Sequence, residues 1–280
     1  MFDSPEAAAA NELEGDVLIG FFDDATSALA ALCDGIGLEV LRVLDLGSGP
    51  GVGSCVLAER FGEATVIAAD GSSAMLDRAA ARAARLGLAD RVEIRRVDLA
   101  TELDTLGRAD LVWASMSLHH VGDELAALRE VHRLLEPGGL VALVERHAPT
   151  RVLPDSVDLG RPGIWDRLDA AWADWFTDMR ADLPGSTESA DYPSMLTAAG
   201  FDLVADHVLA VSIDEPLDEA GRRFALKQMR QSRGKLHDRA DPADLDALDA
   251  LLDEHAPDGI MHRDDVFVRS TRRLYVGRCR

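Results

Sequence analysis

Lysine and cysteine are scarce in this sequence, and it contains no long uninterrupted hydrophobic run. Only two of the 29 basic residues are lysines, and the three cysteines (Cys33, Cys55 and Cys279) form no CxxC pair. This odd, scattered set disfavours a disulfide scaffold or a zinc ribbon and predicts a reducing compartment. Without an apolar run of bilayer length, we expect no membrane span. The first residues lack a basic region, so we expect no secretory signal and a cytoplasmic protein.

Basic charge is also in deficit, and this narrows the range of partners. Fifty acidic residues oppose the 29 basic ones, which gives a formal net charge of −21 at pH 7. A field of this sign repels phosphate backbones and anionic membranes. The histidines show no spacing that would hold a metal with cysteines or acids. We therefore expect no nucleic acid, no membrane and no metal as partners. The protein is expected to be a monomer or homodimer.

What the sequence does contain is an alternation of apolar runs and helical segments. Hydrophobic residues make up 47% of the 280 residues, ample for a core. The apolar runs at 40–46, 64–69, 92–97, 109–116 and 140–144 predict strands, and segments 54–61, 73–86 and 123–135 predict helices between them. Two later runs, 201–213 and 266–278, complete seven strands. This order predicts a Rossmann-like α/β fold with a doubly wound, mostly parallel sheet.

Helical additions surround the predicted sheet. We expect a single domain over residues 1–280, in which 1–38 form helices that pack on the rest, 39–149 form the core, and 193–213 and 265–280 supply closing strands. Segments 150–192 and 214–264 are mostly helical and are predicted to form a lid that binds substrate. Aromatic residues gather near one helical face of the first addition: Trp165, Trp172, Trp175 and Phe176. They are candidates for the wall of an apolar substrate pocket, although ordinary packing of an inserted helix is the alternative.

A glycine-rich loop follows the first predicted strand. It reads Asp45-Leu46-Gly47-Ser48-Gly49-Pro50-Gly51 and precedes a helix, which is the context of a nucleotide-binding loop. A dinucleotide loop requires GxGxxG, but the last glycine of that pattern is missing whether the count starts at Gly47 or at Gly49. Pro50 also removes an N–H donor that a phosphate would use. A nicotinamide oxidoreductase is therefore a remote alternative.

The D-x-G-x-G-x-G pattern resembles motif I of the class I S-adenosylmethionine (SAM) dependent methyltransferases. Asp70 ends the second strand and is followed by Gly71-Ser72-Ser73-Ala74-Met75-Leu76, which is similar to the D-x-S-x-x-M-L segment of that family. Asp98-Leu99 follows the third strand at the position where the family reads adenine. The segments Ser115–Asp123 and Leu128–Leu140 resemble the LHH-x-x-D and P-G-G regions of its UbiE-like branch.

This resemblance implies SAM as cofactor and S-adenosylhomocysteine (SAH) as product. It assigns the ribose hydroxyls to Asp70, the adenine to Met75, Asp98 and Leu99, and the amino-acid end to the acid of the glycine loop. The cofactor-binding candidates are Asp45, Gly47, Ser48, Gly49, Gly51, Asp70, Gly71, Met75, Asp98, Leu99 and Ser115. The family fold implied by the resemblance agrees with the alternation of strands and helices.

Two histidines and an acid are candidates for the chemistry. His119 and His120 follow the fourth strand and Glu145 ends the fifth, all at the edge of the sheet where ligands bind. Imidazole titrates near neutrality and can take a proton from a hydroxyl. One hypothesis makes His119 or His120 the general base, with Glu145 orienting it or contacting substrate. The alternative is that the histidines only shape the pocket and that Glu145 is a solvated strand end.

These features predict a methyltransferase that acts on a small molecule. The acceptor is expected to be a hydroxyl of an aromatic or polyketide-like compound of secondary metabolism. The alternative is a SAM-binding enzyme of the same fold that catalyses a non-methylating reaction, such as a pericyclisation or a decarboxylation. The motifs report cofactor binding and do not separate these two possibilities.

Overall fold

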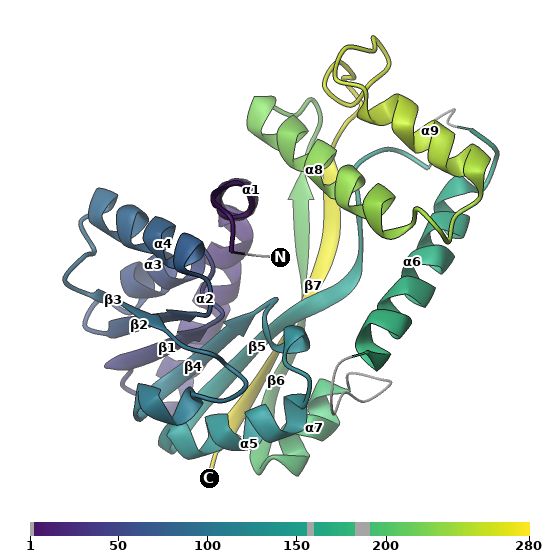
Figure 1. The fold of residues 1–280 in the computed structure, drawn as a ribbon. Coiled ribbons are helices and arrows are strands. Elements are labelled where there is room, and N and C mark those ends of the chain that lie inside the picture. Colours follow the sequence, from purple (N-terminus) through teal and green to yellow (C-terminus); the bar gives the residue numbers. More distant parts are fainter. Residues whose placement is uncertain (1–2, 156–159, 183–190) are drawn as a thin grey trace. The chain divides into compact units, whose positions relative to one another are not determined.

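The computed structural model describes residues 3–155, 160–182 and 191–280 of the chain (Figure 1). The contacts divide the chain into two compact units. Unit 1 consists of Met1–Arg146, Leu183–Leu209 and Arg272–Arg280, and unit 2 consists of His147–Asp182 and Ala210–Thr271. Unit 2 takes in most of the two segments that the sequence predicts as additions. Their role as a substrate-binding lid, like the assignment of the whole chain to one domain, stays a prediction.

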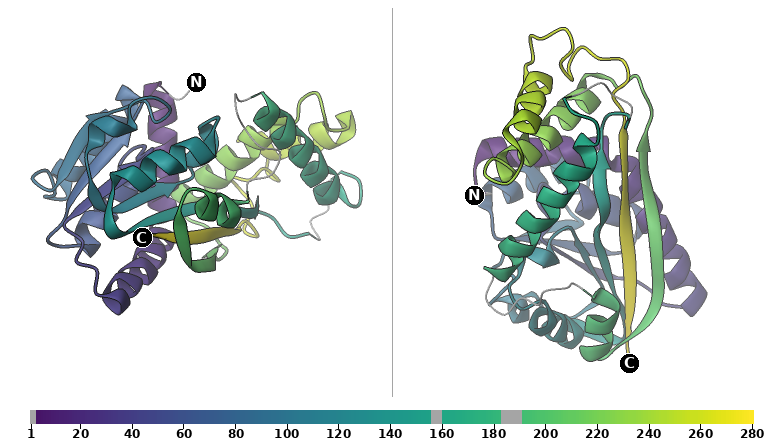
Figure 2. Two further views of the ribbon diagram at one scale, coloured as in Figure 1. Left: turned by 90° about the horizontal axis from the view of Figure 1, so that it is seen from below. Right: turned by 90° about the vertical axis from the view of Figure 1, so that its right-hand side faces the viewer.

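Seven strands in the described residues form one sheet in the order β3-β2-β1-β4-β5-β7-β6. They are β1 (Arg42–Leu46), β2 (Thr65–Asp70), β3 (Val92–Arg96), β4 (Ala109–Ser115), β5 (Leu135–Arg151), β6 (Phe201–Ile213) and β7 (Val268–Cys279). Parallel pairing joins β1 to both β2 and β4, β2 to β3, and β4 to β5. Figure 2 shows β7, in yellow, between β5 and β6. This mostly parallel sheet confirms the predicted Rossmann-like fold.

The strand order reverses between β1 and β4. From β1 the chain moves outward through β2 to β3 and then returns to β4 on the other side of β1. In doubly wound sheets such a reversal opens a crevice at the carboxyl ends of the strands, where ligands bind. The register pairs Leu46 with Ala69 and Asp45 with Trp113. The loops that follow β1, β2 and β4 therefore start close together at this edge.

The central strands are buried along consecutive residues. Val43 and Leu44 of β1, and Leu111, Val112 and Trp113 of β4, are each inaccessible to solvent. A parallel strand covered on both faces requires such unbroken apolar runs, whereas a half-exposed strand would alternate. The same runs predict these strands from the sequence, and the structure confirms both to within two residues.

The described helices are α1 (Pro5–Val17), α2 (Ile19–Ile36), α3 (Val52–Arg60), α4 (Ser73–Arg85), α5 (Glu124–Leu134), α6 (Ile164–Ala181), α7 (Tyr192–Ala198), α8 (Glu219–Lys235) and α9 (Pro242–Leu252). Single 3-10 turns lie at Leu103–Leu106 and Leu118–His120. Helix α2 runs through Gly35 and ends at Ile36, and the capping residue Gly37 adopts a left-handed φ of 68°.

Helix α1 packs on the two helices that flank the glycine loop. It approaches α3 so closely that a Cβ added to Gly15 would lie 2.5 Å from Val52 Cγ2. Toward α4, Nη2 of the buried Arg82 lies 2.5 Å from Asp16 Oδ1, and Nη1 of Arg78 lies at the same distance from Glu12 Oε2. Side chains of α1 thus contact both α3 and α4.

Strand β5 is longer than the sequence predicts. The prediction starts it at Leu140, after a Glu136-Pro137-Gly138-Gly139 turn, and ends it at Val144, whereas the structure extends it from Leu135 to Arg151. Leu135 pairs with Ala109 and Leu140 pairs with Leu111, so five steps on β5 match two on β4. The expected turn is thus present as a bulge inside the strand.

In unit 2, the predicted helical stretch 150–190 is only partly helical. Residues up to Arg151 belong to β5, helix α6 covers Ile164–Ala181, and residues 156–159 and 183–190 lie outside the described residues. Helices α8 and α9 lie within the second predicted addition, residues 214–264.

No helix among the described residues is long and apolar enough to cross a membrane.

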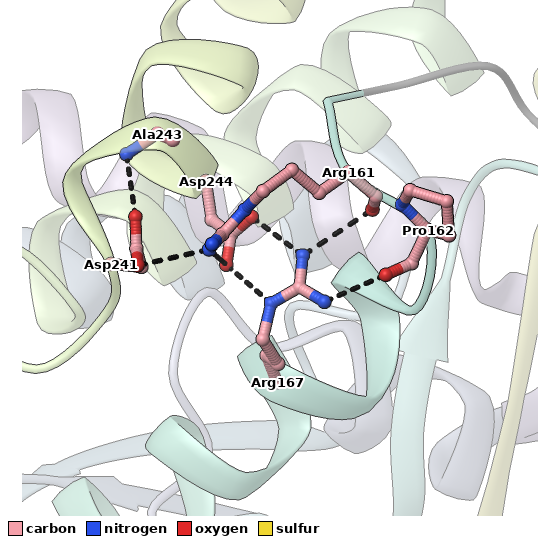
Figure 3. Close-up of polar contacts among 6 residues, drawn as sticks. All are labelled: Arg161, Pro162, Arg167, Asp241, Ala243 and Asp244. Atoms are coloured by element: carbon pink, nitrogen blue, oxygen red, sulfur yellow. Dashed lines mark hydrogen bonds and ion pairs between the residues drawn. The ribbon is translucent and has the colours of Figure 1, made fainter.

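A buried carboxylate ties the start of α6 to the start of α9 within unit 2 (Figure 3). Asp244 is 1% exposed, and both its oxygens accept from Arg167, whose Nε and Nη2 each lie 2.7 Å away. Arg161 Nη2 lies 3.2 Å from the same carboxylate. Arg167 Nη1 also donates to the Pro162 carbonyl, 2.8 Å away. The two arginines satisfy the buried charge through a bidentate bond and a second ion pair.

Candidate functional site

The glycine loop turns sharply after β1 and is hydrogen-bonded to the end of β2. The backbone N–H groups of Gly47 and Ser48 both donate to the Ala69 carbonyl, at 2.8 and 3.0 Å. Gly47 has a φ of +72°, and a Cβ there would lie 2.3 Å from Ser117 Cβ. Only glycine fits this position, because a side chain would face both a strained backbone and a direct clash. The loop therefore packs directly against the side chain of Ser117, after β4.

Asp70 fixes the loop from the end of β2. Its Oδ2 accepts from the Gly49 N–H at 2.9 Å, and its Oδ1 accepts from the Ser72 N–H at 2.9 Å. A carboxylate offers about four acceptor positions, so these two bonds leave capacity for ligand hydroxyls. The side chain is half-buried at the predicted carboxyl edge. Asp70 thus orders the loop and stands where the sequence analysis expects a ribose-binding acid.

Asp45 lies beneath the loop and not at its surface. It is 2% exposed, and its Oδ2 accepts from the Ser54 hydroxyl at 2.5 Å. Burial raises the pKa of Asp45 to about 7; the Ser54 hydrogen bond acts in the opposite direction, and the negative charge of Asp70 adds a small further rise. Ser54, on α3, is absent from the sequence-derived candidates. Its partner is nine residues away, so no local pattern identifies it.

The predicted adenine residues are placed on two different segments. Met75 is buried on α4, and its Sδ lies 3.9 Å from Asn11 Nδ2 of α1. Asp98 is exposed, and its Oδ1 accepts from the Ala100 N–H at 2.9 Å. Leu99 Cδ1 lies 3.6 Å from the position of a Cβ on Gly47, and Gly71 is exposed beside Asp70. Their contact with a cofactor stays a prediction.

The backbone after β4 is strained. Met116 has a φ of 55°, the only positive φ of a non-glycine residue in the described chain. Its N–H donates to the Val144 carbonyl of β5 at 2.8 Å, and Ser117 Oγ donates to the Leu46 carbonyl of β1 at 2.6 Å. Such strain is found where the surrounding structure fixes a functional segment. Ser117, which the sequence analysis does not single out, links this segment to the glycine loop.

His119 and Glu145 are in direct contact. The ring Nδ1 of His119 lies 2.7 Å from Oε2 of Glu145, and both side chains are largely buried. The ring of His120 lies beside that of His119, with centroids 4.2 Å apart, but His120 is exposed. Of the two candidate bases, His119 is therefore the one that the structure joins to the acid.

Buried polar atoms without partners lie along the same edge. Oγ of Ser48, Oγ of Ser115 and Oε1 of Glu145 are buried and make no hydrogen bond to any described residue. Buried polar atoms of this kind are costly unless a ligand or water satisfies them. The loop is open beside them, because a Cβ on Gly49 would meet nothing within 4 Å. The hydroxyls, the spare acceptors of Asp70 and the buried Met75 therefore fit SAM, which has polar hydroxyl and amino groups and an apolar-faced base.

The four aromatic candidates all belong to α6 in unit 2. Trp165 is buried, and its Nε1 donates to the Pro154 carbonyl at 3.4 Å. Trp172 stacks on Phe176 with ring centroids 5.2 Å apart, and Lys235 Nζ of α8 lies 4.3 Å from the ring centroid of Trp175. These contacts are internal to unit 2. A role of the aromatic residues in substrate binding stays a prediction. Among the described residues, no group of three or more His, Cys, Asp or Glu side chains is placed to hold a metal.

Comparison with known proteins agrees with this geometry. A family model described as "Methyltransferase domain" matches residues 43–139. The chain is 39% identical over 125 residues to a trans-aconitate 2-methyltransferase of Methylobacterium radiotolerans, covering 44% of this chain and 45% of that protein. It is 28% identical over 207 residues to a trans-aconitate 2-methyltransferase of an Azoarcus species, covering 72% of each chain. For the first relative, the match thus spans less than half of its length.

A solved structure shares the fold. A SAM-dependent methyltransferase from Geobacter sulfurreducens, determined in complex with SAH, superposes with a TM-score of 0.51 over 92% of this chain and 91% of that chain. The sequence identity is 20%, so this likeness concerns the fold alone. The match to a methyltransferase domain over residues 43–139, the sheet order and the glycine loop make the chain similar to the class I SAM-dependent methyltransferase family. The cofactor of this family is SAM, as the sequence resemblance implies.

Proposed function

We propose that this protein transfers a methyl group from SAM to a hydroxyl oxygen of a small molecule, with His119 as the general base. The observation that carries the proposal is the 2.7 Å contact between His119 Nδ1 and Glu145 Oε2. An imidazole held by a carboxylate at the binding edge of the sheet is suited to take a proton from an alcohol or a phenol. An acceptor that arrives already ionised would not need it.

The residues divide into those that hold the cofactor and those that act on the acceptor. Asp70, the glycine loop and Met75 would hold SAM, which supplies an electrophilic methyl group when bound. With Glu145 accepting from Nδ1–H, the Nε2 atom of His119 is the basic one. Glu145 also stabilises the imidazolium that forms when His119 takes the proton. Positioning of the two reactants supplies much of the remaining rate.

A second candidate is the methylation of a carboxylate. The two curated relatives described above are named for trans-aconitate, which is an acid. A carboxylate is ionised at neutral pH and needs no base, so turnover would then be insensitive to the loss of His119. The non-methylating alternative differs from both in its product. It releases no SAH, whereas either methyl transfer yields one SAH for each turnover.

The first experiment is a calorimetric titration of the protein with SAH, with NAD⁺ as the control ligand. We expect micromolar SAH binding and no NAD⁺ binding. Asp70→Ala should weaken SAH binding by about 2 kcal/mol, or about thirtyfold, because buried acceptor bonds are lost. Binding of NAD⁺ without SAH would contradict the proposal. An acceptor screen that follows SAH release then separates methyl transfer from other SAM-assisted reactions.

The setting of the reaction is part of the same proposal. We propose an aromatic or polyketide-like acceptor of secondary metabolism, and a cytoplasmic monomer or homodimer. The net charge of −21 and the three buried free cysteines support a reducing compartment and a partner other than nucleic acid. Sedimentation of the purified protein would give its oligomeric state.

A further inference from the structure

Arg272, on β7, is buried, and within the described part of the chain its guanidinium donates no hydrogen bond. It is 9% exposed, and its side chain makes no hydrogen bond to any described residue. The nearest acid is Glu14 of α1, whose Oε1 lies 3.7 Å from Nη2, too far for a hydrogen bond. The guanidinium carbon lies 4.9 Å from the ring centroid of Phe21. An arginine has five N–H donors, so this side chain keeps its hydrogen-bonding capacity.

The next residue along the strand shows how an arginine is ordinarily satisfied here. Arg273 donates through Nε and Nη2 to the two oxygens of Asp206, at 2.6 and 2.7 Å. Successive residues of a strand point to opposite faces of the sheet, so the two arginines have different surroundings. Arg273 forms a complete bidentate ion pair with the protein, and Arg272 does not.

The charges around Arg272 do not remove the cost of its burial. Burial lowers the pKa of Arg272, and the positive charge of Arg146 lowers it further, while Glu14 and Glu145 act in the opposite direction. A buried cation needs good hydrogen-bond geometry to be stable, since attraction at a distance does not replace lost hydration. An anion that accepted hydrogen bonds from the guanidinium would supply the hydrogen bonds that Glu14 does not make.

Arg272 also interacts electrostatically with the acid that holds the proposed base. Strand β7 is the direct neighbour of β5, which carries Glu145. The charge of Glu145 acts on Arg272, and Glu145 in turn holds His119. All of these residues, with Glu14 and Phe21, belong to unit 1. A ligand group on Arg272 would therefore be held by the same unit and by the strand next to the proposed site.

We propose that Arg272 binds a carboxylate of the acceptor, and hence that the acceptor is a small hydroxy acid. This inference rests on the proposed function, because it assigns the second functional group of the same acceptor. The fork of N–H donors in a guanidinium matches the two oxygens of a carboxylate. The face of Phe21 under the guanidinium keeps the arginine in place and shields the pair from water.

The test uses salicylate, which has a hydroxyl beside a carboxylate, and salicylamide, in which the carboxylate is replaced by a neutral amide. trans-Aconitate serves as a second acid. Each is titrated by calorimetry into the 280-residue protein saturated with SAH. We expect at least one acid to bind, and salicylamide to bind about tenfold or more weakly than salicylate, the scale of one lost charged hydrogen bond.

Variants then locate the effect. Arg272→Gln should weaken binding of the acid about tenfold or more while SAH affinity stays within about twofold. Arg272→Lys keeps the positive charge but loses the forked set of N–H donors. Its affinity for the acid should lie between those of the wild type and Arg272→Gln. Arg273→Gln is the matched control on the same strand and should bind the acid like the wild type. Thermal unfolding confirms that each variant folds. If Arg272→Gln does not fold, Arg272→Lys carries the test.

The outcomes separate this inference from the function on which it rests. If SAH binds but no acid binds more tightly than salicylamide, the carboxylate site is wrong and the cofactor assignment stands. The same conclusion follows if a folded Arg272 variant binds the acid like the wild type, since Glu14 would then be the true partner of Arg272. If SAH itself fails to bind, the proposed function is wrong.

Discussion

The imidazole of His119 and the carboxylate of Glu145 form a hydrogen bond of 2.7 Å between Nδ1 and Oε2. His119 lies in the 3-10 turn after β4, and Glu145 lies on β5 one residue beyond Val144, which pairs with the last residue of β4. The sheet register therefore sets their contact. The second oxygen of Glu145 is buried without a partner among the described residues, so the acid is available to a ligand as well.

Removing the imidazole should abolish most of the activity without affecting the cofactor. We expect His119→Ala to lower kcat by about 100- to 10,000-fold, the range for loss of a general base, with SAH affinity within about twofold of wild type. Glu145→Gln should lower kcat less, because the imidazole remains but is no longer stabilised as a cation. Turnover is measured as SAH release with the acceptor found by the screen.

His120→Ala is the matched control for this prediction. Its ring is exposed, and Glu145 is bonded to its neighbour. We expect a loss of less than about tenfold in kcat, because His120 is not held by the acid. If His120→Ala is the more damaging of the two changes, the base is assigned to the wrong histidine. If neither change affects turnover, the acceptor arrives ionised and the carboxylate candidate gains.

Local sequence predicted the sheet well because its signals are local. An unbroken apolar run such as Leu140–Val144 predicts a buried strand. The glycines that follow β1 predict a turn. The extension of β5 to Arg151 was missed because Glu145–Arg151 has neither an apolar run nor an alternation. Its strand conformation comes from neighbouring strands, which no local pattern reports.

The same distinction applies to the candidate site. Asp70 was found because it ends a strand and precedes a helix cap, both of which are visible along the chain. Ser54 and Ser117 were missed because their hydrogen bonds, to Asp45 and to the Leu46 carbonyl, depend on how separate elements meet. Nothing in the neighbouring sequence distinguishes Arg272 from Arg273. Only burial and partners separate them.

Asp45 should make the stability of the protein fall as the pH rises from about 4 to about 7. Burial raises the pKa of Asp45 to about 7 from its ordinary value of 3.8. The folded state therefore holds this proton where the unfolded state has lost it, and folding is disfavoured with increasing pH across that window. The slope is at most about 1.4 kcal/mol per pH unit.

The measurement is the thermal midpoint at several pH values for the wild type and for Asp45→Asn. The asparagine still accepts from Ser54 but does not titrate, so its midpoint should change less between pH 5 and 7, within the window set by the two pKa values. Asp77→Asn, an exposed change on α4, should keep the wild-type slope. Parallel curves for wild type and Asp45→Asn would show that Asp45 is ionised throughout.

Gly47→Ala should destabilise unit 1 and weaken SAH binding together. Alanine at a φ of +72° costs about 1–2 kcal/mol, and its Cβ would lie 2.3 Å from Ser117 Cβ, which adds about 1–3 kcal/mol of overpacking. Gly35→Ala is the control, because its Cβ meets nothing within 4 Å and helix α2 continues through it. It should stabilise by about 0.5–1 kcal/mol. An unchanged Gly47→Ala protein would mean that the loop and Ser117 separate readily.

Asp244 provides a test of unit 2 that leaves the proposed site untouched. Removing it breaks a bidentate bond to Arg167 and the ion pair to Arg161 (Figure 3). We expect Asp244→Ala to destabilise unit 2 by about 2–4 kcal/mol, toward the lower end of the range for a buried pair because both arginines are partly solvated. Tryptophan fluorescence follows this loss, since Trp165, Trp172 and Trp175 all lie on α6.

The stabilisation of unit 2 by Asp244 should depend on pH. The Arg167 hydrogen bond holds the pKa of Asp244 below its ordinary value, so its stabilisation is complete above about pH 4 and is lost as the pH falls through the lowered pKa. Asp244→Ala should therefore differ most from wild type at neutral pH and converge with it in acid. Asp246→Asn, an exposed change on the same helix, should match wild type throughout. A constant difference at every pH would mean that packing, and not charge, ties α6 to α9.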